Sequence, residues 1–560
     1  MPLQKNQIIT LSIERLSGDG SGVGHWEGEA VFVPGTAPGD VIRARIVKDC
    51  KRYAFGIVEA VETASPDRIP ADCPVAGPCG GCSLRHLRYE AELQAKQAAV
   101  ADAFRRIGGL DVPVEPILPS PEVDRYRNKV QYPVGLDKAG RPCIGFYAGR
   151  SHRIVPCADC KLQPAILNEI GSALCGLFDQ YGIQPYDEAS GAGLVRHIFL
   201  RRGTHSGQIM VCLVCTRPRL PHAAELTAAL CARFRDIRTV LLNVNPDKTN
   251  VILGRENRVL YGPGFIEDTL CGVPVRLGPF SFYQVNTPGA EQLYGVAAAY
   301  ADPSPDDLLL DLYCGMGTIG LSMAGRCRAL VGVEVVPEAI ESAKANAARM
   351  GDAIAAKSRF FCADAGEAAR RLAAGGLAPD IVIVDPPRKG CDEATLAAIL
   401  EMSPRRLVYV SCNPSTAARD AARLAREGYR VEKVQPVDMF PRTGHVEAVI
   451  LLSKLHAEHH IDVELKMDEL DLTAAESKAT YQEIKDYVKE QTGLNVTPPT
   501  LRRSSRSAGL SSGRATTSPN QRTPSSPSVR PRRKRSFGRR WSIFKDRLSQ
   551  NQSGRQCPAG

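Results

Sequence analysis

The stretch that decides the fold is IVIVDPPRKGCDEATLAAILEMSPRRLVYVSCNP, residues 381–414. Its two short runs rich in β-branched residues, Ile381–Val384 and Arg406–Val410, predict strands buried on both faces, with a helix between them. Each predicted strand ends in polar residues, DPPR after the first and SCNP after the second. Because the carboxyl ends of the strands form the ligand crevice of an open α/β sheet, we expect Asp385 and Cys412 in one pocket. The alternative is that Cys412 is a small buried apolar residue, as free cysteines commonly are.

The segments before this unit continue the alternation of strands and helices. LLLDLYCGMGTIGL (308–321) predicts a strand and a glycine loop that opens a helix, and ALVGVE and SRFFCAD predict two more strands. Four successive strands thus end at or near an acid, namely Asp311, Glu334, Asp364 and Asp385. A Rossmann-like sheet brings such acids into one crevice, where the acid after the second strand suits ribose hydroxyls. The loop lacks the Walker lysine pattern, which disfavours ATP hydrolysis, and an NAD enzyme is a minority alternative.

Three segments after the unit predict the end of the same sheet. Ser415–Gly428 predicts a helix with its first residue as N-cap. Arg430–Val437 and Glu447–Lys454 predict two strands that form the antiparallel end of a methyltransferase-type sheet. The intervening DMFPRTGHVE brings His445 and Glu447 to one sheet edge.

The first 63 residues predict a small β-barrel. Its strand-like segments are separated by GDGSGVG and PGTAPGD, and they are Ile8–Ile13, Glu29–Val33, Val41–Val47 and Gly56–Glu62. Lys48, Lys51, Arg52 and Tyr53 form a basic and aromatic loop at one edge. Such a loop suits an RNA-binding barrel, and a solvated surface loop is the equal alternative.

A run of closely spaced cysteines follows in CPVAGPCGGCSLRH, with Cys73, Cys79 and Cys82. Its glycines allow the backbone to wrap closely round a bound group. Tetrahedral sulfur ligation needs a fourth thiol, which Cys160 or Cys157 can supply. Zinc and a 4Fe–4S cluster both remain open, and unrelated free thiols are the alternative. The chain has 18 cysteines and no signal-peptide pattern, which indicates reduced thiols rather than a disulfide framework.

The middle of the chain predicts mixed α and β structure. Tyr89–Ile107 has helical periodicity and ends at two glycines, while Val130–Ile154 and Val195–Val214 predict antiparallel strands with one helix near 165–181 between them. No run of 18 apolar residues and no secretion signal occurs. We therefore expect no membrane span and a cytoplasmic location.

Several motifs in this order resemble the RNA uracil-C5 methyltransferase family, chiefly its branch acting on 23S ribosomal RNA. They are the cysteine run, YRNK (126–129), SFYQVN (281–286), DLYCGMGTIGL (311–321), DPPRKG (385–390), VSCNPST (410–416) and DMFPRTGHVE (438–447). The resemblance implies an α/β fold in three parts. These are a TRAM-like, OB-like barrel over residues 1–63, an α+β central domain with an iron–sulfur cluster over 64–280, and a Rossmann-like S-adenosylmethionine (SAM) methyltransferase domain over 281–455. We expect helix 89–107 to pack on the catalytic domain.

The resemblance also implies roles for individual residues. Cys73, Cys79, Cys82 and Cys160 would ligate a 4Fe–4S cluster, although the extra thiol of Cys157 competes for the fourth place. The SAM site would be lined by Gln284, Tyr313, Thr318, Glu334, Asp364 and Asp385. Cys412 would be the nucleophile and Glu447 the base.

The chemistry of the methyl transfer explains why these residue types are needed. Uracil C5 is too weak a nucleophile to take the methyl group unaided, so a thiolate adds to C6, an enolate forms, and a base then removes the C5 proton. A free thiol with a pKa of about 8.5 is only slightly ionised near neutral pH, so a cation such as Arg388 or His445 would help. Asp385 would orient the pyrimidine or SAM. The target base must leave its stack to react.

The RNA partner implied is ribosomal RNA rather than transfer RNA, because plain transfer-RNA relatives lack the cluster and the barrel, and no obligate protein partner is expected. A tRNA uracil-C5 methyltransferase is one alternative, and a non-catalytic RNA-binding iron–sulfur protein is another. An amino-methyltransferase also carries Asp-Pro-Pro, usually followed by an aromatic residue where this chain has Arg388.

The residues after 455 differ in composition. Residues 456–496 carry 10 acids and 4 lysines and predict an acidic helical extension, which resembles an appendage of some family members. Residues 497–560 carry 15 Lys/Arg and one acid and predict a disordered basic tail that binds RNA electrostatically. The first 455 residues therefore hold only +2 of the net charge of +10, so any basic patch in them must be local.

A second hypothesis for the tail is a shifted reading frame. One possible coding of residues 503–509, moved by one base, reads Gln-Val-Lys-Pro-Lys-Cys-Gly, which resembles a continuation of the extension. Resequencing the gene tests this hypothesis, and we assign the tail no catalytic role.

Overall fold

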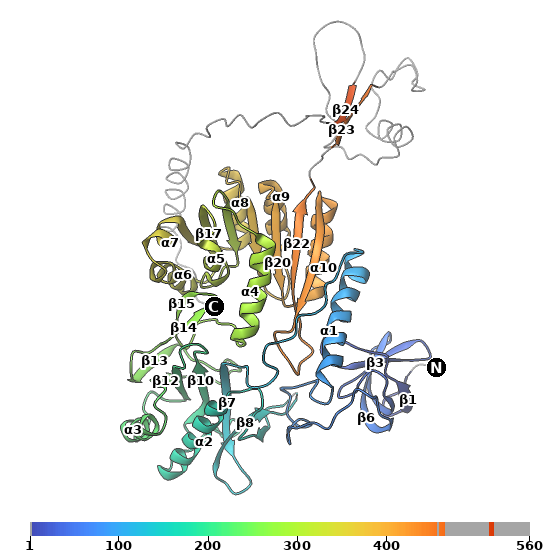
Figure 1. The fold of residues 1–560 in the computed structure, drawn as a ribbon. Coiled ribbons are helices and arrows are strands. Elements are labelled where there is room, and N and C mark those ends of the chain that lie inside the picture. Colours follow the sequence, from blue (N-terminus) through green and yellow to red (C-terminus); the bar gives the residue numbers. More distant parts are fainter. Residues whose placement is uncertain (1–2, 150, 456–458, 465–513, 520–560) are drawn as a thin grey trace. The chain divides into compact units, whose positions relative to one another are not determined.

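The computed structural model describes residues 3–149, 151–455, 459–464 and 514–519 (Figure 1). The chain divides into two compact units, Met1–Lys454 and Leu455–Gly560, and each is described by itself. None of the helices in the described residues is long and apolar enough to cross a membrane.

A seven-stranded sheet forms the methyltransferase-like part of the first unit. Its order is β18-β17-β16-β19-β20-β22-β21, with β18 to β20 parallel and the last two strands antiparallel. The strands are β16 (Leu308–Leu312), β17 (Ala329–Glu334), β18 (Ser358–Cys362), β19 (Ile381–Val384), β20 (Arg406–Ser411), β21 (Tyr429–Val437) and β22 (Glu447–Lys454). Every residue of β19 is buried, and so is every residue of β20 after Arg406, which confirms the prediction of strands buried on both faces.

Helices flank this sheet in the order expected of a doubly wound fold (Figure 1). They are α4 (Thr287–Ala301), α5 (Thr318–Ala324), α6 (Pro337–Arg349), α7 (Asp352–Lys357), α8 (Ala365–Ala374), α9 (Glu393–Met402) and α10 (Pro414–Arg426). The N-cap of α10 was predicted wrongly as Ser415. It is Asn413, whose side-chain oxygen accepts from the N–H of Ser415, because Pro414 already occupies the first helical position.

The N-terminal barrel has six strands in the order β1-β5-β6-β4-β3-β2. They are β1 (Ile8–Ser12), β2 (Arg15–Leu16), β3 (Gly22–Trp26), β4 (Glu29–Val33), β5 (Val41–Asp49) and β6 (Tyr53–Thr63). The sequence pattern missed β3, whose glycines resemble a turn. A Cβ on Gly24 would lie 2.2 Å from the carbonyl oxygen of Ser12, so this glycine allows close packing of the barrel rather than a turn.

A second seven-stranded sheet, in the order β13-β12-β11-β10-β7-β8-β9, forms the central region. Its strands are β7 (Lys129–Leu136), β8 (Pro142–Tyr147), β9 (Ile154–Pro156), β10 (Val195–Arg202), β11 (Ile209–Cys215), β12 (Ile237–Val244) and β13 (Glu256–Tyr261). The helices α2 (Ala165–Gln180) and α3 (Ala223–Arg233) and the hairpin β14 (Ile266–Leu270)–β15 (Val273–Leu277) complete it. The β11–α3–β12 crossover, with parallel strands, was not predicted.

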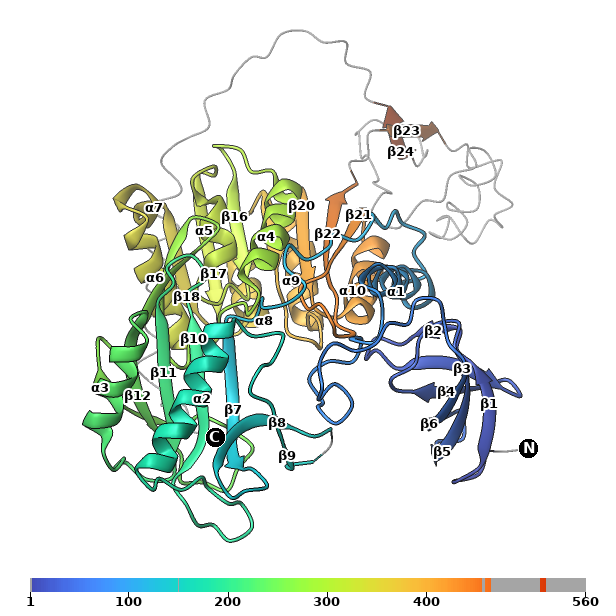
Figure 2. The same ribbon diagram turned by 60° about the horizontal axis from the view of Figure 1, so that its bottom comes forward.

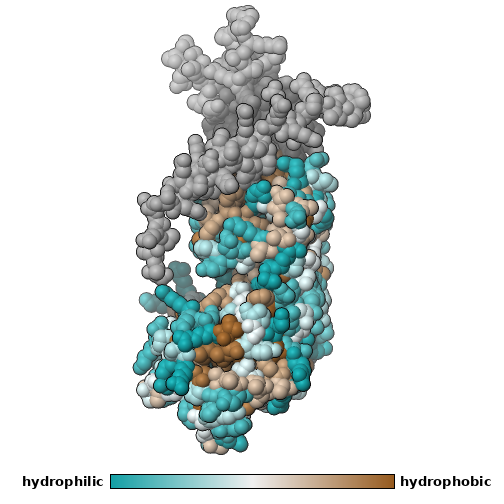
Figure 3. All heavy atoms as spheres, turned by 90° about the vertical axis from the view of Figure 1, so that its left-hand side faces the viewer, coloured by the Kyte–Doolittle hydropathy of each residue, from teal (hydrophilic) through white to brown (hydrophobic). Residues whose placement is uncertain are grey.

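Figure 3 faces the side of the molecule on which Figure 1 shows the edge strand β13. It shows a hydrophobic patch within a largely hydrophilic surface. Val259 and Tyr261, which belong to β13, are among the large apolar side chains that are exposed to solvent.

Helix α1 (Tyr89–Asp102) joins the N-terminal part of the chain to the methyltransferase-like sheet (Figure 2). It continues as a π-helical turn over Ala103–Gly108 and ends at Gly109, which has a φ of +62°. It packs against α10 and β21, which follow it by more than three hundred residues in the chain. The N-terminal segment and the C-terminal end of the sheet thus form one structure.

In the second unit the structure describes β23 (His459–Glu464) and β24 (Arg514–Pro519), which pair antiparallel. These twelve residues are strands where the sequence predicted a helical extension and a disordered tail. The rest of the predicted extension and tail, including residues 503–509, lies outside the described residues.

Candidate active site

The register of β20 and β22 places Cys412 opposite Glu447. Ser411 is paired with Ala448 at the end of the antiparallel ladder, so the next residues along the two strands face each other. Asp385 follows the neighbouring parallel strand β19, whose last residue Val384 pairs with Tyr409 of β20. The structure therefore brings Asp385, Cys412 and Glu447 together at one sheet edge, as predicted. Cys412 is half-buried and not sealed in apolar packing.

Two carboxyl groups with raised pKa values share this edge. The pKa of Glu447 is raised to about 8, first by burial and then by Asp385, while Arg388 opposes the shift. Burial raises the pKa of Asp385 to about 7. Two carboxyl groups that titrate near neutral pH beside a thiol are typical of a site for proton transfer.

The thiol of Cys412 shares these surroundings. Burial raises its pKa, and the carboxylates of Glu447 and Asp385 raise it further, whereas Arg388 lowers it. The prediction of a helpful cation thus holds for Arg388 only. His445 does not fill that role, because burial and the positive charge of Arg388 lower its own pKa.

The turn that carries Arg388 is hydrogen-bonded to the start of α10. The carbonyl of Arg388 accepts from Nδ2 of Asn413 at 3.0 Å and from Oγ1 of Thr416 at 3.3 Å. The buried carboxylate of Asp420 accepts from the N–H of Cys391 at 2.8 Å. The two loops that follow β19 and β20 therefore hold each other in place.

The glycine loop after β16 is organised by two acids. Oδ2 of Asp311 accepts from the N–H of Gly320 at 2.9 Å, and burial raises the pKa of this carboxyl to about 8. Glu334 accepts from the N–H of Gly315 at 3.2 Å. The loop adopts left-handed backbone at Gly317, with a φ of +80°.

The remaining predicted SAM-site residues lie around this loop. Tyr313 has a left-handed φ of +64°, and its hydroxyl lies 3.3 Å from Oγ1 of Thr395. Thr318 begins α5. Asp364 caps α8, because its Oδ1 accepts a hydrogen bond from the N–H of Glu367. Helix capping therefore explains the position of this oxygen even when no ligand is bound. Gln284 lies just before α4.

Sequence reasoning missed Tyr294 on α4. This buried side chain lies near Thr318, Gln284 and Asp385, and burial together with Asp385 raises the pKa of its hydroxyl. It thus lies beside three predicted site residues from different segments. In the sequence Tyr294 is a single tyrosine on an apolar helix, and nothing in that pattern indicates that it lies beside the site.

Comparison with known proteins places this geometry in a family. A family model described as tRNA (Uracil-5-)-methyltransferase matches residues 272–455, and a TRAM domain model matches residues 2–58. An RNA methyltransferase of Halalkalibacterium halodurans is 42% identical over 452 residues, which cover 80% of this chain and 98% of that protein. The chain belongs to the RNA uracil-C5 methyltransferase family. It is thus an RNA methyltransferase with an N-terminal TRAM domain.

Two further similarities agree with this family. An RNA methyltransferase of Listeria monocytogenes is 42% identical over 454 residues, covering 80% of this chain and 98% of its own. The solved structure of the Pyrococcus abyssi tRNA (uracil-54, C5)-methyltransferase in complex with S-adenosyl-L-homocysteine is 28% identical. It covers 79% of this chain and 100% of its own, with a TM-score of 0.63.

This family member also has a cavity of about 250 Å³ lined by five thiols. The thiols belong to Cys73, Cys79, Cys82, Cys157 and Cys160. Arg85, Arg127 and Lys129 line the same cavity and supply positive charge. No group of three or more ligating side chains within the described residues is arranged to hold a single metal ion. The cavity thus combines thiols with cationic side chains.

Proposed function

We propose that this chain methylates C5 of a uracil in RNA, with SAM as the methyl donor, through a covalent bond between Cys412 and C6. The observation that carries the proposal is the pairing of β20 with β22, which sets Cys412 opposite Glu447 and close to Asp385. A nucleophilic thiol and a base on one sheet edge are the two groups that the reaction requires.

In the first step the thiolate of Cys412 adds to C6 of the uracil. The C6–S bond forms, and the electrons of the C5–C6 double bond move toward C5 and O4. Arg388 is the cation that opposes the raised pKa of the thiol and stabilises the thiolate. Asp385, with a pKa of about 7, is partly protonated near neutral pH and can then donate a hydrogen bond to the uracil edge.

In the last step Glu447 removes the proton from C5 of the methylated adduct. The electrons of the C5–H bond re-form the C5–C6 double bond, and the C6–S bond breaks to return the thiolate of Cys412. A base with a pKa near the working pH is efficient in this role, and that of Glu447 is about 8.

The residues round the glycine loop fit SAM. Glu334 lies at the tip of the second strand, where an acid suits ribose hydroxyls, and its carboxylate already orders the loop through Gly315. Oδ1 of Asp311 is buried and has no hydrogen-bond partner among the described residues, so it can pair with a polar group of a bound ligand. When bound, SAM supplies a methyl group on a positively charged sulfur. The S-adenosyl-L-homocysteine in the Pyrococcus abyssi structure supports this choice of donor.

For the thiol cavity we propose a 4Fe–4S cluster held by Cys73, Cys79, Cys82 and Cys160. We assign the cluster a structural role, because it would fix the loop between the barrel and α1. Anaerobically purified protein should contain iron and sulfide and absorb visible light. The variant Cys160→Ser should lose this absorbance and Cys157→Ser should keep it; the reverse result would make Cys157 the fourth ligand.

The TRAM barrel supports RNA binding at one end. Phe32, Tyr53 and Phe55 lie with ring centroids 5.6–5.8 Å apart, and Tyr53 is 40% exposed. Lys51 and Arg52 are exposed directly before Tyr53. Aromatic rings beside cations suit unstacked RNA bases.

The substrate proposed first is 23S ribosomal RNA, on the resemblance of the cysteine run and barrel to that branch. Transfer RNA is the second candidate, because the Pyrococcus abyssi protein acts on transfer RNA by its name. Mapping 5-methyluridine in both RNA classes from cells with and without the gene tests the proposal. A site lost from ribosomal RNA supports the first candidate, one lost from transfer RNA supports the second, and no lost site contradicts both.

A further inference from the structure

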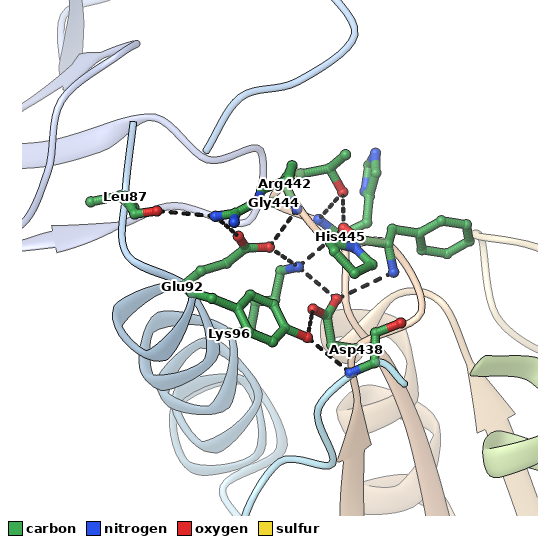
Figure 4. A network of polar contacts seen from close by, with 12 residues as sticks. Leu87, Glu92, Lys96, Asp438, Arg442, Gly444 and His445 are labelled. Carbon is green, nitrogen blue, oxygen red and sulfur yellow. Dashed lines mark hydrogen bonds and ion pairs between the residues drawn. The ribbon is translucent and has the colours of Figure 1, made fainter. Parts of the chain in front are cut away.

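The loop that leads to Glu447 is held by a buried network of charges (Figure 4). Residues 438–446 connect β21 to β22, and Glu447 is the first residue of β22. The network consists of Glu92 and Lys96 of α1 and Asp438 of the loop. The side chain of Lys96 is 2% exposed, and those of the two acids are fully buried.

Lys96 stands at the centre of the network and uses three contacts. Its Nζ donates to Oε1 of Glu92 at 2.7 Å, to Oδ1 of Asp438 at 2.7 Å and to the carbonyl of Phe440 at 3.1 Å. An ammonium group has three donors, so all of them are used. Two of the three contacts are made to the loop.

The acids extend the network in both directions. Oε1 of Glu92 accepts from the N–H of Arg442 at 2.7 Å. Oδ2 of Asp438 accepts from the hydroxyl of Tyr89 at 2.8 Å, and that hydroxyl accepts from the N–H of Ser120. Helix α1 thus holds the loop at its beginning, through Asp438, and in its middle, through Arg442.

The segment after Cys82 holds the same loop from another direction. The N–H groups of Ser83 and Leu84 donate to the carbonyl of Arg442 at 3.0 and 3.1 Å. The N–H of Gly444 donates to Oγ of Ser83 at 3.1 Å. Arg442 has a left-handed φ of +68°, a conformation that persists in a non-glycine residue only when surrounding contacts impose it.

The loop matters because of where it begins and ends. Val437 pairs with Glu447 at the last position of the β21–β22 ladder, and Asp438 follows Val437 directly. A loop anchored at Asp438 therefore keeps this end of the ladder closed, with Glu447 opposite Cys412. Stability alone does not account for three buried charges here, because apolar packing of similar volume commonly stabilises a fold as well or better.

We propose that Lys96, together with Glu92 and Asp438, is the positioning device for the general base Glu447. This inference rests on the proposed function, in which Cys412 forms the adduct and Glu447 ends it. Adduct formation and methyl transfer depend on Cys412, whereas removal of the C5 proton depends on the place of Glu447. Disturbing the network therefore slows the release of methylated RNA from Cys412 more than it slows the formation of the adduct.

The experiment uses the full chain with SAM and an RNA that the wild-type chain methylates. Single-turnover reactions are stopped in denaturant, and the fraction of RNA bound covalently to protein is measured over time. The variants are Lys96→Met, which removes the central cation, and Tyr89→Phe, which removes one hydroxyl and keeps all three charges. Arg106→Met is the matched control, because Arg106 is 65% exposed near the end of the same helical segment and pairs with Asp102 at 3.5 Å.

For Lys96→Met we expect release slowed about 10- to 100-fold, in line with the effect of a misplacement of about 1 Å, while adduct formation changes by about twofold or less. Methylated RNA then accumulates on the protein. Tyr89→Phe should accumulate less of it, and Arg106→Met none. If circular dichroism shows that Lys96→Met is unfolded, Tyr89→Phe decides the question alone.

Two results would overturn the inference. One is release at the wild-type rate in the folded variants; the other is an equal slowing of adduct formation and release, which a merely structural role would produce. The proposed function fails differently, because the wild-type chain would then form no covalent complex even with RNA that contains 5-fluorouridine, where C5 carries no proton to remove.

Discussion

The crevice and the network beside it differ in how closely their buried acids are paired with a cation. In the crevice, Glu447 lies near Asp385, Arg388 opposes the shift of Glu447, and burial raises the pKa of both carboxyls into the neutral range. In the network, Lys96 lies 2.7 Å from both Glu92 and Asp438. Buried carboxyl groups whose charge is only partly compensated by a cation can exchange protons near neutral pH. Acids that are closely paired with a cation instead fix the position of their chain segment. The two regions meet at the loop that ends at Glu447.

The largest effect should come from the thiol in the crevice. Cys412→Ala removes the only atom proposed to bond to C6, so we expect neither 5-methyluridine nor a covalent complex. Methyl incorporation from labelled SAM into RNA measures the loss. Cys231→Ala, which changes a half-buried thiol on α3, is the control and should remain active. Methylation by Cys412→Ala at the control rate would exclude a covalent mechanism.

Substitution of the base Glu447 should have the second-largest effect. Glu447→Gln keeps the size of the side chain but cannot accept the C5 proton, so we expect turnover to fall by about 10²- to 10⁴-fold. The covalent complex should still form and persist. The measurement is multiple-turnover methylation beside the amount of complex that survives denaturant. Loss of the complex as well as of turnover would contradict the division of roles between Cys412 and Glu447.

Removal of the central cation of the network should affect stability strongly. Lys96→Met leaves Asp438 buried without its cation and Glu92 with the more distant guanidinium of Arg442, at 3.8 Å, which we expect to lower the free energy of unfolding by about 3–5 kcal/mol. Lys344→Met, which breaks the ion pair between Lys344 and Glu341 on the surface of α6, should cost about 1 kcal/mol or less. Urea unfolding of both variants measures the difference. Equal losses of unfolding free energy in the two variants would show that the charges of the buried network are not closely coupled.

The smallest effect is the pH dependence that Glu447 gives to stability. Its pKa rises from 4.5 to about 8 on folding, so the folded chain binds the proton more tightly than the unfolded chain. The stability from this group is complete below about pH 4.5 and is lost as pH rises toward about 8. Glu447→Gln should therefore gain stability relative to wild type by about 1–3 kcal/mol between these limits. Glu341→Gln, at an exposed position, should show no such gain, and a constant difference for Glu447→Gln would contradict the raised pKa.

The crevice could be predicted from the sequence because it is built from strand ends. Periodicity located β19 and β20, the polar residues after them identified the sheet edge, and the last two strands brought Glu447 to the same edge. These relations follow from the topology of an open α/β sheet and need no knowledge of side-chain contacts. The assignment of Arg388 as a nearby cation held for the same reason.

The network could not be predicted, because its contacts join distant segments. Lys96 and Asp438 are 342 residues apart, and each taken singly is a common charged residue. Tyr294 gave no signal for a similar reason. The strand β3 was missed because its glycines serve close packing, while the same residue type usually marks a turn.

The most direct test of the central claim is to locate the bond between protein and RNA. RNA that contains 5-fluorouridine is incubated with the wild-type chain and SAM, the complex is digested, and mass spectrometry identifies the modified peptide. A nucleotide that carries both the fluorine and the transferred methyl group, attached to Cys412, is the predicted result. Attachment at another residue, or methylated RNA without any attachment, would contradict it.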